Sequence, residues 1–264
     1  MKQLNCQMEF PLQIKNLTLQ YGSRIIQRDL SFDVKCGEIF VVMGGSGCGK
    51  STLLRHLIGL LRPKVGEIFV LGKEIWKIAP EERLKQMRQI GIVYQKGGLW
   101  STMTLFENIA LLLRMYSPCS EPEIQQLCEL KLSLVGLSGY GNFYPSEISG
   151  GMQRRAALAR AIALEPKLLF LDEPSSGLDP VSAHRLDELI LQLRDMLGAT
   201  IVVITHDLDS IFTIADRAVY LDHVKKTITA CGTLSELKNR TDHADLHDFL
   251  TRGKNMNVGE KENE

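Results

Sequence analysis

The stretch that decides the fold is Ile39-Phe40-Val41-Val42-Met43-Gly44-Gly45-Ser46-Gly47-Cys48-Gly49-Lys50-Ser51-Thr52. It opens with a continuous apolar run of the length expected for a strand that is buried on both faces. The run leads into the pattern G-x-x-x-x-G-K-(S/T), and the residues after it predict a helix over 51–58. A strand, a glycine-rich loop and a helix in this order form the first βα unit of a nucleotide-binding sheet.

The glycine-rich loop has the chemistry of a phosphate site. Glycines let successive backbone N–H groups turn toward phosphate oxygens, and the following helix points its positive N-terminus at the same anion. We expect Lys50 to reach the β- and γ-phosphates and the Ser51 hydroxyl to ligate Mg²⁺. The other residues expected to bind the nucleotide here are Gly44, Gly45, Ser46, Gly47, Cys48, Gly49 and Thr52.

Two further buried strands are expected at residues 168–171 and 201–204, with a helix over 183–197 between them. This second crossover indicates a parallel sheet. Asp172 and Glu173 directly follow the earlier of these strands, at the edge where such sheets bind ligands. We therefore expect Asp172 to contribute to the Mg²⁺ site and Glu173 to be the general base for water that attacks the γ-phosphate.

The remaining segments predict smaller parts of an α/β fold. Short strands with alternating apolar positions are expected within the first 40 residues. From about residue 97 to 160 the chain is Leu-rich and helical in pattern, which indicates a helical lobe inserted into the parallel-sheet core. Residues 254–264 are polar and predict a mobile C-terminal tail.

Composition and charge exclude several classes of protein. Of the 264 residues, 44% are hydrophobic and 23% are charged, which excludes disorder over most of the chain and a collagen-like scaffold. The 31 Lys and Arg residues balance 31 Asp and Glu residues. A dedicated nucleic-acid binder usually carries a basic surplus, so no nucleic-acid partner is expected. Neither a signal peptide nor a membrane span is expected, so any membrane role should come through a partner.

The motif that identifies the family is Ile148-Ser149-Gly150-Gly151-Met152-Gln153-Arg154-Arg155. With it, the chain resembles the ATP-binding subunits of ABC transporters over about residues 10–250. That family carries an L-S-G-G-Q signature, from which this chain departs by Ile148 and Met152. The resemblance implies an ATPase of the P-loop NTPase fold, with an N-terminal antiparallel β lobe and one ABC domain over residues 1–253. It also implies that Ser149, Gly150 and Gly151 bind the γ-phosphate of ATP held by a second, identical subunit.

Four single residues match other positions of the family. The resemblance implies that Gln95 senses Mg²⁺ and water, that Asp179 contacts the second subunit, and that His206 hydrogen-bonds the γ-phosphate. It implies that Tyr21 stacks on adenine through its π-face. Together with Glu173, the expected catalytic residues are Gln95 and His206, and the expected Mg²⁺ ligands are Ser51, Gln95 and Asp172.

Two stretches, residues 44–57 and 150–160, are similar to the Mla-type subgroup. Met152 and the pair Arg154-Arg155 are typical of it, and residues 95–100 resemble its Q-x-G-A-L-F stretch. These ATPases energise trafficking of phospholipid or other lipids with a membrane permease and a periplasmic Mce-type protein. The resemblance thus implies a homodimer on the cytoplasmic face of the inner membrane, a permease, an Mce-type protein and a small accessory subunit.

Three alternatives stay open from the sequence. They are an ABC ATPase of a polar-solute importer, a regulatory ABC ATPase of an envelope complex without transport, and a soluble ABC protein acting on DNA or ribosomes. Proteins of the last kind usually carry two cassettes or a long coiled-coil insertion, and this chain has neither.

Cysteine and histidine residues yield two smaller expectations. The six cysteines are scattered without a C-x-x-C pair, which favours reduced thiols. Because Cys48 lies near Lys50 and a helix N-terminus, we expect a lowered pKa and inhibition by thiol alkylators that ATP prevents. His243 and His247 are four residues apart, and a solvated helix face is favoured over a metal site.

Overall fold

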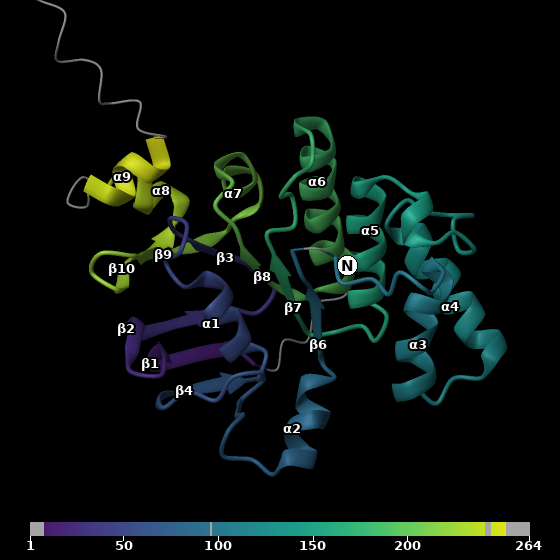
Figure 1. Cartoon of the computed structure of the whole chain (residues 1–264), viewed down its shortest axis with the longest axis horizontal. Coiled ribbons are helices and arrows are strands. Elements are labelled where there is room, and N and C mark those ends of the chain that lie inside the picture. The colour runs from purple at the N-terminus through teal and green to yellow at the C-terminus, as the bar shows by residue number, and fades with distance from the viewer. Residues whose placement is uncertain (1–7, 96, 241–243, 252–264) are drawn as a thin grey trace, which may run out of the picture.

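A six-stranded sheet forms the centre of the structure, a computed structural model that describes residues 8–95, 97–240 and 244–251 (Figure 1). The strand order is β10-β9-β3-β8-β7-β6, in which all neighbours are parallel except β9 and β10. The strands are β3 (Ile39–Met43), β6 (Ile90–Val93), β7 (Leu168–Asp172), β8 (Thr200–Ile204), β9 (Arg217–Asp222) and β10 (Thr227–Thr233).

The three predicted core strands are confirmed as β3, β7 and β8, and each is buried at every position. Their apolar runs are continuous because both faces of the sheet are covered. Phe40 and Val42 of β3 pack with one hydrophobic cluster, and Ile39, Val41 and Met43 pack with another on the opposite face. The sequence patterns did not lead us to predict β9 and β10, which extend the sheet beyond β3.

An antiparallel sheet covers one face of the central sheet together with α1 (Lys50–Leu57). Its order is β2-β1-β4-β5, which confirms the antiparallel lobe. The rings of Phe32 and Phe40 stack across this interface with centroids 5.4 Å apart. The strands are β1 (Leu12–Tyr21), β2 (Arg24–Val34), β4 (Val65–Val70) and β5 (Lys73–Glu74), and α2 (Pro80–Met87) follows them.

The predicted helical stretch contains α3 (Leu105–Tyr116), α4 (Glu121–Leu134), the 3₁₀ turn η1 (Pro145–Glu147) and α5 (Gly150–Ala161), beside β6 in Figure 1. Thr104 and Glu107 form a capping box that starts α3, and Ser120 and Glu123 form another at α4. The prolines Pro122 and Pro145 stand in the first turns of α4 and η1, where a missing N–H costs nothing.

Helices α6 (Pro180–Leu197), α7 (Leu208–Ile214), α8 (Leu234–Lys238) and α9 (Ala244–Thr251) complete the described chain. Phe249 of α9 packs on Tyr220 of β9 with centroids 5.4 Å apart. Within the described residues, no helix is long and apolar enough to cross a membrane. The expected tail, 254–264, lies outside the described residues.

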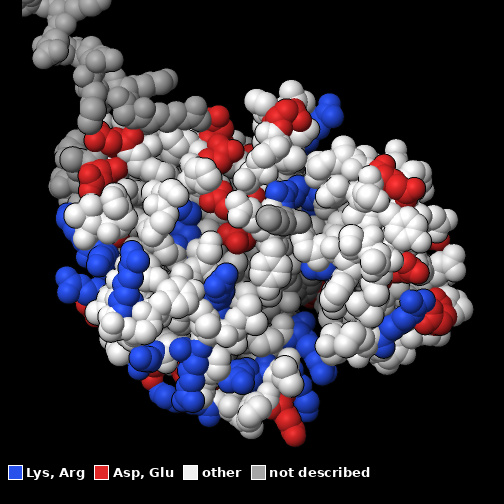
Figure 2. All heavy atoms as spheres, viewed as in Figure 1, with Lys and Arg blue, Asp and Glu red and all other residues white. Residues whose placement is uncertain are grey.

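The balanced charge of the chain is not spread evenly. Figure 2 shows that Lys and Arg side chains gather over the antiparallel sheet and α2 on the face in view.

Cys36 is disulfide-bonded, so the expectation of six reduced thiols is wrong at this position. Spacing along the chain could not indicate a disulfide, because folding decides which thiols come together.

Candidate active site

The glycine-rich loop turns sharply between β3 and α1, and its first and last glycines are required by the fold. Gly49 has φ 102°, and a Cβ atom there would lie 2.7 Å from Cγ2 of Ile26. At Gly44 an added Cβ would lie 2.6 Å from the carbonyl oxygen of Leu221. Larger side chains are therefore excluded at both ends of the loop.

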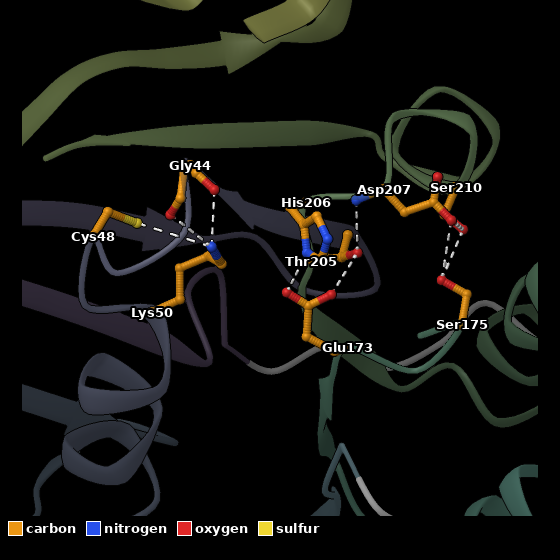
Figure 3. Close-up of polar contacts among 10 residues, drawn as sticks. Gly44, Cys48, Lys50, Glu173, Ser175, Thr205, His206, Asp207 and Ser210 are labelled. Atoms are coloured by element: carbon orange, nitrogen blue, oxygen red, sulfur yellow. Dashed lines mark hydrogen bonds and ion pairs between the residues drawn. The ribbon is translucent and has the colours of Figure 1, made fainter. Parts of the chain in front are cut away.

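The side chains of Lys50 and Gln27 stabilise this loop through hydrogen bonds to its backbone carbonyl groups. The Lys50 ammonium donates hydrogen bonds to the carbonyl oxygens of Gly44 (2.8 Å) and Gly45 (3.1 Å) (Figure 3). The fully buried Gln27 donates from Nε2 to the carbonyl oxygens of Cys48 (2.7 Å) and Asp222 (3.0 Å).

Gln27 was missed in the sequence because β2 does not keep a simple alternation. Asp29 adopts φ 53°, and the pairing of β1 with β2 shifts between Leu17↔Leu30 and Leu19↔Gln27. This bulge turns Gln27 inward from a position that the pattern does not mark.

The strand ends bring the predicted residues together. Ile204 of β8 pairs with Val42 of β3 on one side and with Asp172 of β7 on the other, so these three strands end level. A cleft of about 380 Å³ opens at this edge. It is lined by Ile26, Ser46, Gly47, Gly49, Lys50, Ser51, Thr52, Gln95, Glu173 and His206, of which only Ile26 was not predicted.

Glu173 and His206 contact each other at the edge of the cleft. His206 Nδ1 lies 2.8 Å from Glu173 Oε1, and Thr205 Oγ1 donates to Glu173 Oε2 at 3.3 Å (Figure 3). Because Nδ1 makes this contact, Nε2 of His206 is left for another partner, and the His206 side chain is 62% exposed.

The backbone of Glu173 is unusual. Its φ of 47° places a non-glycine residue in the left-handed region, where the strain is about 1–3 kcal/mol. Its N–H donates to the carbonyl oxygen of Ile204 at 2.7 Å. This turn directs the carboxylate across the end of β8, where Thr205 and His206 follow.

Asp172 has the environment of a cation ligand. Burial, and next Glu173, raise the pKa of its carboxyl, while Lys50 and Arg55 oppose the rise. Among the described residues, none offers a hydrogen bond to its buried Oδ1. A hydroxyl, a carboxylate and an amide oxygen from Ser51, Asp172 and Gln95 are oxygen donors of the kind that Mg²⁺ prefers.

In the described part of the chain, no group of three or more His, Cys, Asp or Glu side chains could hold a metal ion. Of the two histidines considered above, His243 lies outside the described residues.

Four predicted positions, at the starts of α5 and α6, lie away from the cleft. Ser149 caps α5 by accepting a hydrogen bond from Met152 N–H at 3.3 Å, and Gly150 and Gly151 form the first turn of that helix. Asp179 caps α6, with Oδ1 accepting from the N–H groups of Val181 (3.1 Å) and Ser182 (3.0 Å).

Tyr21 does not line the cleft. It is 46% exposed at the end of β1, and its hydroxyl accepts a hydrogen bond from Arg55 of α1 at 3.2 Å. The side chain that lines the cleft beside the loop is Ile26 of β2 instead. Ile26 follows the turn in which Tyr21 pairs with Arg24, and its Cγ2 lies 2.7 Å from the position of a Cβ added at Gly49.

Arg154 connects the start of α5 to two other motifs. Its guanidinium donates to the carbonyl oxygen of Tyr94 (3.4 Å), next to Gln95, and to that of Ser176 (3.2 Å), in the turn before Asp179. A movement of α5 would therefore displace the segment around Gln95 and the turn before Asp179.

The expected lowering of the Cys48 pKa is wrong. Cys48 is 2% exposed, and burial raises the pKa of its thiol although Lys50, with Nζ 4.0 Å from Sγ, opposes the rise. Removal from water destabilises the thiolate of Cys48 more than the neighbouring ammonium of Lys50 stabilises it. Alkylation of Cys48 therefore requires opening of the loop.

Comparisons with known proteins agree with this geometry. The model of the ABC transporter family matches residues 27–176. The chain is 40% identical over 231 residues to the intermembrane phospholipid transport system ATP-binding protein MlaF of Haemophilus influenzae, covering 88% of this chain and 87% of that protein. It is 41% identical over 210 residues to the probable ribonucleotide transport ATP-binding protein mkl of Mycobacterium leprae, covering 80% of this chain but only 60% of that protein.

Among solved structures, the fold matches the dimeric post-hydrolysis state of the ATP-binding cassette MJ0796 bound to ADP and Pi. The TM-score is 0.75 at 29% identity, and the match covers 84% of this chain and 98% of that chain.

Proposed function

This chain belongs to the ABC transporter family, as an ATP-binding and ATP-hydrolysing subunit, and we propose that it powers phospholipid trafficking across the cell envelope through a membrane permease. The observation that carries the lipid assignment is the 40% identity to a phospholipid transport ATP-binding protein over 87% of its length. Met152 and the pair Arg154-Arg155 support the same subgroup.

The geometry of the chain supports each proposed role in hydrolysis. Lys50, held by the loop carbonyls, binds the β- and γ-phosphates. Glu173 takes the proton of the attacking water, and its carboxylate is oriented for this by Thr205 and His206. With hydrogen on both ring nitrogens, His206 donates from Nδ1 to Glu173 and from Nε2 to the γ-phosphate.

We assign the Mg²⁺ site to Ser51, Gln95 and Asp172. The unpartnered Oδ1 of Asp172 supports this assignment, because a buried carboxylate oxygen needs a donor or a cation. When bound, the ion neutralises charge on the β- and γ-phosphates.

The working unit in this proposal is a homodimer in which two subunits complete each ATP site. Ser149, Gly150 and Gly151 lie outside their own chain's cleft, which supports a role for them toward ATP in the second subunit. Asp179 would contact the same partner. Closure on ATP and opening after hydrolysis would then be passed to the permease.

A groove between α2, α3 and α5 is the proposed docking site of the permease. It encloses about 440 Å³ and includes the exposed side chains Leu84, Trp100 and Tyr116. The guanidinium of Arg88 stands 4.5 Å from the centroid of the Tyr116 ring. The basic side chains over α2 in Figure 2 suit a position beside the anionic inner face of a membrane.

We place the protein on the cytoplasmic side of the inner membrane, attached through this permease, with an Mce-type protein on the other side and a small accessory subunit. A second candidate cargo is a polar solute, which the similarity to a probable ribonucleotide transport protein favours.

The test is to purify the tagged full chain from native membranes and to identify bound proteins and lipids by mass spectrometry. The matched control is Leu84→Glu, which places a charge in the groove and leaves the ATP cleft intact. We expect a permease, an Mce-type protein and phospholipid with the wild type, all depleted with L84E. A permease without lipid enrichment over this control would exclude the phospholipid assignment.

A further inference from the structure

Behind Glu173 and His206, four polar side chains form what we call the Asp187 cluster: Ser175, Asp187, Asp207 and Ser210. They come from three places in the fold: Ser175 from the turn after β7, Asp187 from α6, and Asp207 and Ser210 from the N-cap and body of α7. Ser175, Asp187 and Ser210 are each at most 4% exposed. Water therefore cannot readily replace the hydrogen bonds that these groups make to each other.

The contacts of the cluster run in a chain from α6 to the edge of the catalytic cleft. Ser210 Oγ lies 2.8 Å from Asp187 Oδ2 and 3.3 Å from Ser175 Oγ, and Ser175 Oγ lies 3.3 Å from Asp207 Oδ2. A longer contact of 3.4 Å joins Ser210 Oγ to Asp207 Oδ2. Figure 3 shows Ser175 opposite the neighbouring side chains of Asp207 and Ser210, on the side of the catalytic pair away from Lys50.

The number of hydroxyl hydrogens limits which contacts of the Asp187 cluster are hydrogen bonds. The two serine hydroxyls supply one hydrogen each, so with both carboxylates ionised the three successive contacts cannot all be hydrogen bonds. Ser210 Oγ donates to Asp187 Oδ2 and Ser175 Oγ donates to Asp207 Oδ2, so each carboxylate accepts one hydroxyl hydrogen, and the two serine oxygens lie 3.3 Å apart between them.

The surroundings of Asp187 raise the affinity of its carboxyl for a proton. Burial raises the pKa of Asp187 to about 6; the Ser210 hydrogen bond and His184 oppose this rise, and Asp207 adds to it. Its Oδ1 is buried and, among the described residues, meets no hydrogen-bond donor. A neutral carboxyl tolerates such a position far better than a carboxylate does.

The cluster joins the same two segments as the catalytic pair. Ser175 is two residues beyond Glu173, and Asp207 directly follows His206. The Glu173–His206 and Ser175–Asp207 contacts are thus two successive links between the end of β7 and the end of β8. Two links fix the rotation of one segment against the other, which a single contact cannot do.

We propose that Asp187 and Ser210 are positioning residues for ATP hydrolysis, which act through Ser175 and Asp207 to keep Glu173 and His206 in their mutual orientation. Neither residue touches the reacting atoms. The inference rests on the catalytic roles proposed above for Glu173 and His206. It adds α6 and α7 to the parts of the molecule that determine the turnover rate.

The test is steady-state ATP hydrolysis by the full chain carrying Asp187→Val, Ser210→Ala or Asp187→Asn. D187V and S210A each remove hydrogen bonds of the Asp187 cluster, whereas the amide of D187N keeps both a donor and an acceptor. We expect D187V and S210A to lower kcat about tenfold or more, with KM for ATP within about twofold of the wild type. D187N should keep at least about half of the wild-type kcat, because it rescues the hydrogen bond.

Asp195→Asn is the matched control, since it makes the same change on α6 at a side chain that is 66% exposed. Wild-type kcat in both D187V and S210A would overturn the proposal, and so would a fall in D187N as deep as in D187V. Should D187V not fold, S210A and D187N decide the question. Glu173→Gln, measured in parallel, separates this outcome from failure of the proposed catalytic roles, because full activity in E173Q would refute those roles instead.

Discussion

Helices α1 and α5 both begin at glycine-rich motifs, but the fold needs their glycines for different reasons. At Gly49, before α1, a positive φ and the closeness of Ile26 exclude any side chain. At Gly150, in the first turn of α5, an added Cβ would meet no atom within 4 Å, and at Gly151 the nearest atom is 3.8 Å away, in Ser182. The first motif is shaped by packing within the chain, and the second leaves room for something outside it.

The two helix starts also share one property. Neither α1 nor α5 has an acidic residue in its first turn or at its N-cap, whereas α2, α3, α4 and α8 have one in the first turn and α6 has Asp179 at its N-cap. The positive ends of α1 and α5 are therefore not neutralised by their own side chains and can serve an anion. The comparison suggests one phosphate site that is built within the chain and a second half-site offered at its surface.

The largest effect on ATP hydrolysis is expected for substitutions in the cleft at the start of α1. Glu173→Gln should lower kcat by about 10²–10⁴-fold and leave ATP binding intact, because the amide cannot accept the proton of water. Lys50→Ala should instead weaken nucleotide binding itself. Hydrolysis rates and binding of labelled ATP, measured on both variants, check this division, and wild-type turnover by E173Q would contradict it.

A substitution at the start of α5 should change the rate of ATP hydrolysis but not the free energy of unfolding. Gly150→Asp has room within its own chain, so the free energy of unfolding should stay within about 0.5 kcal/mol. If this motif binds ATP of the second subunit as proposed, hydrolysis should fall about tenfold or more, because the added carboxylate would repel the phosphates. Urea unfolding and ATPase assays test the two halves of this prediction.

Mixing two variants that are each impaired in a different half of the ATP site sharpens the same comparison. In a heterodimer of G150D and Lys50→Ala chains, one ATP site combines an intact loop with an intact signature. Equal mixing should restore about a quarter of wild-type hydrolysis, because half of the dimers are mixed and each has one complete site. Absence of any recovery would argue against sites shared between subunits.

A smaller effect is expected at Gly49, and on stability. Gly49→Ala forces a Cβ against Ile26 at φ 102°, so the free energy of unfolding should fall by about 1–3 kcal/mol. Gly150→Ala is the matched control and should leave it nearly unchanged. Equal midpoints of urea unfolding for the two variants would show that the contrast between the motifs is not one of packing.

The smallest effect is a pH dependence away from both motifs. The pKa of Asp187 is about 6 in the folded chain, above its unfolded value of 3.8, so the folded state binds the proton more tightly. Wild-type stability therefore falls as pH rises through this interval, and Asp187→Asn lacks that fall. Between pH 5 and pH 8 the unfolding free energy of D187N should gain about 1–2 kcal/mol on the wild type.

Local patterns predicted the parts of this protein that short stretches of chain determine. The apolar runs of β3, β7 and β8 have strand length and lie directly before Gly44, Asp172 and Thr205, so the residues that line the cleft, except Ile26, could be named from the sequence. The continuous runs also revealed burial on both faces, because no polar side chain interrupts them.

Only the tertiary structure decided which segments meet. It inserted β8 between β3 and β7, set Glu173 against His206, and linked Asp187 to Ser175 through Ser210. It buried Cys48, which reversed the expected direction of its pKa shift. These outcomes depend on desolvation and on contacts between residues far apart in the chain, and neither leaves a periodic mark in the sequence.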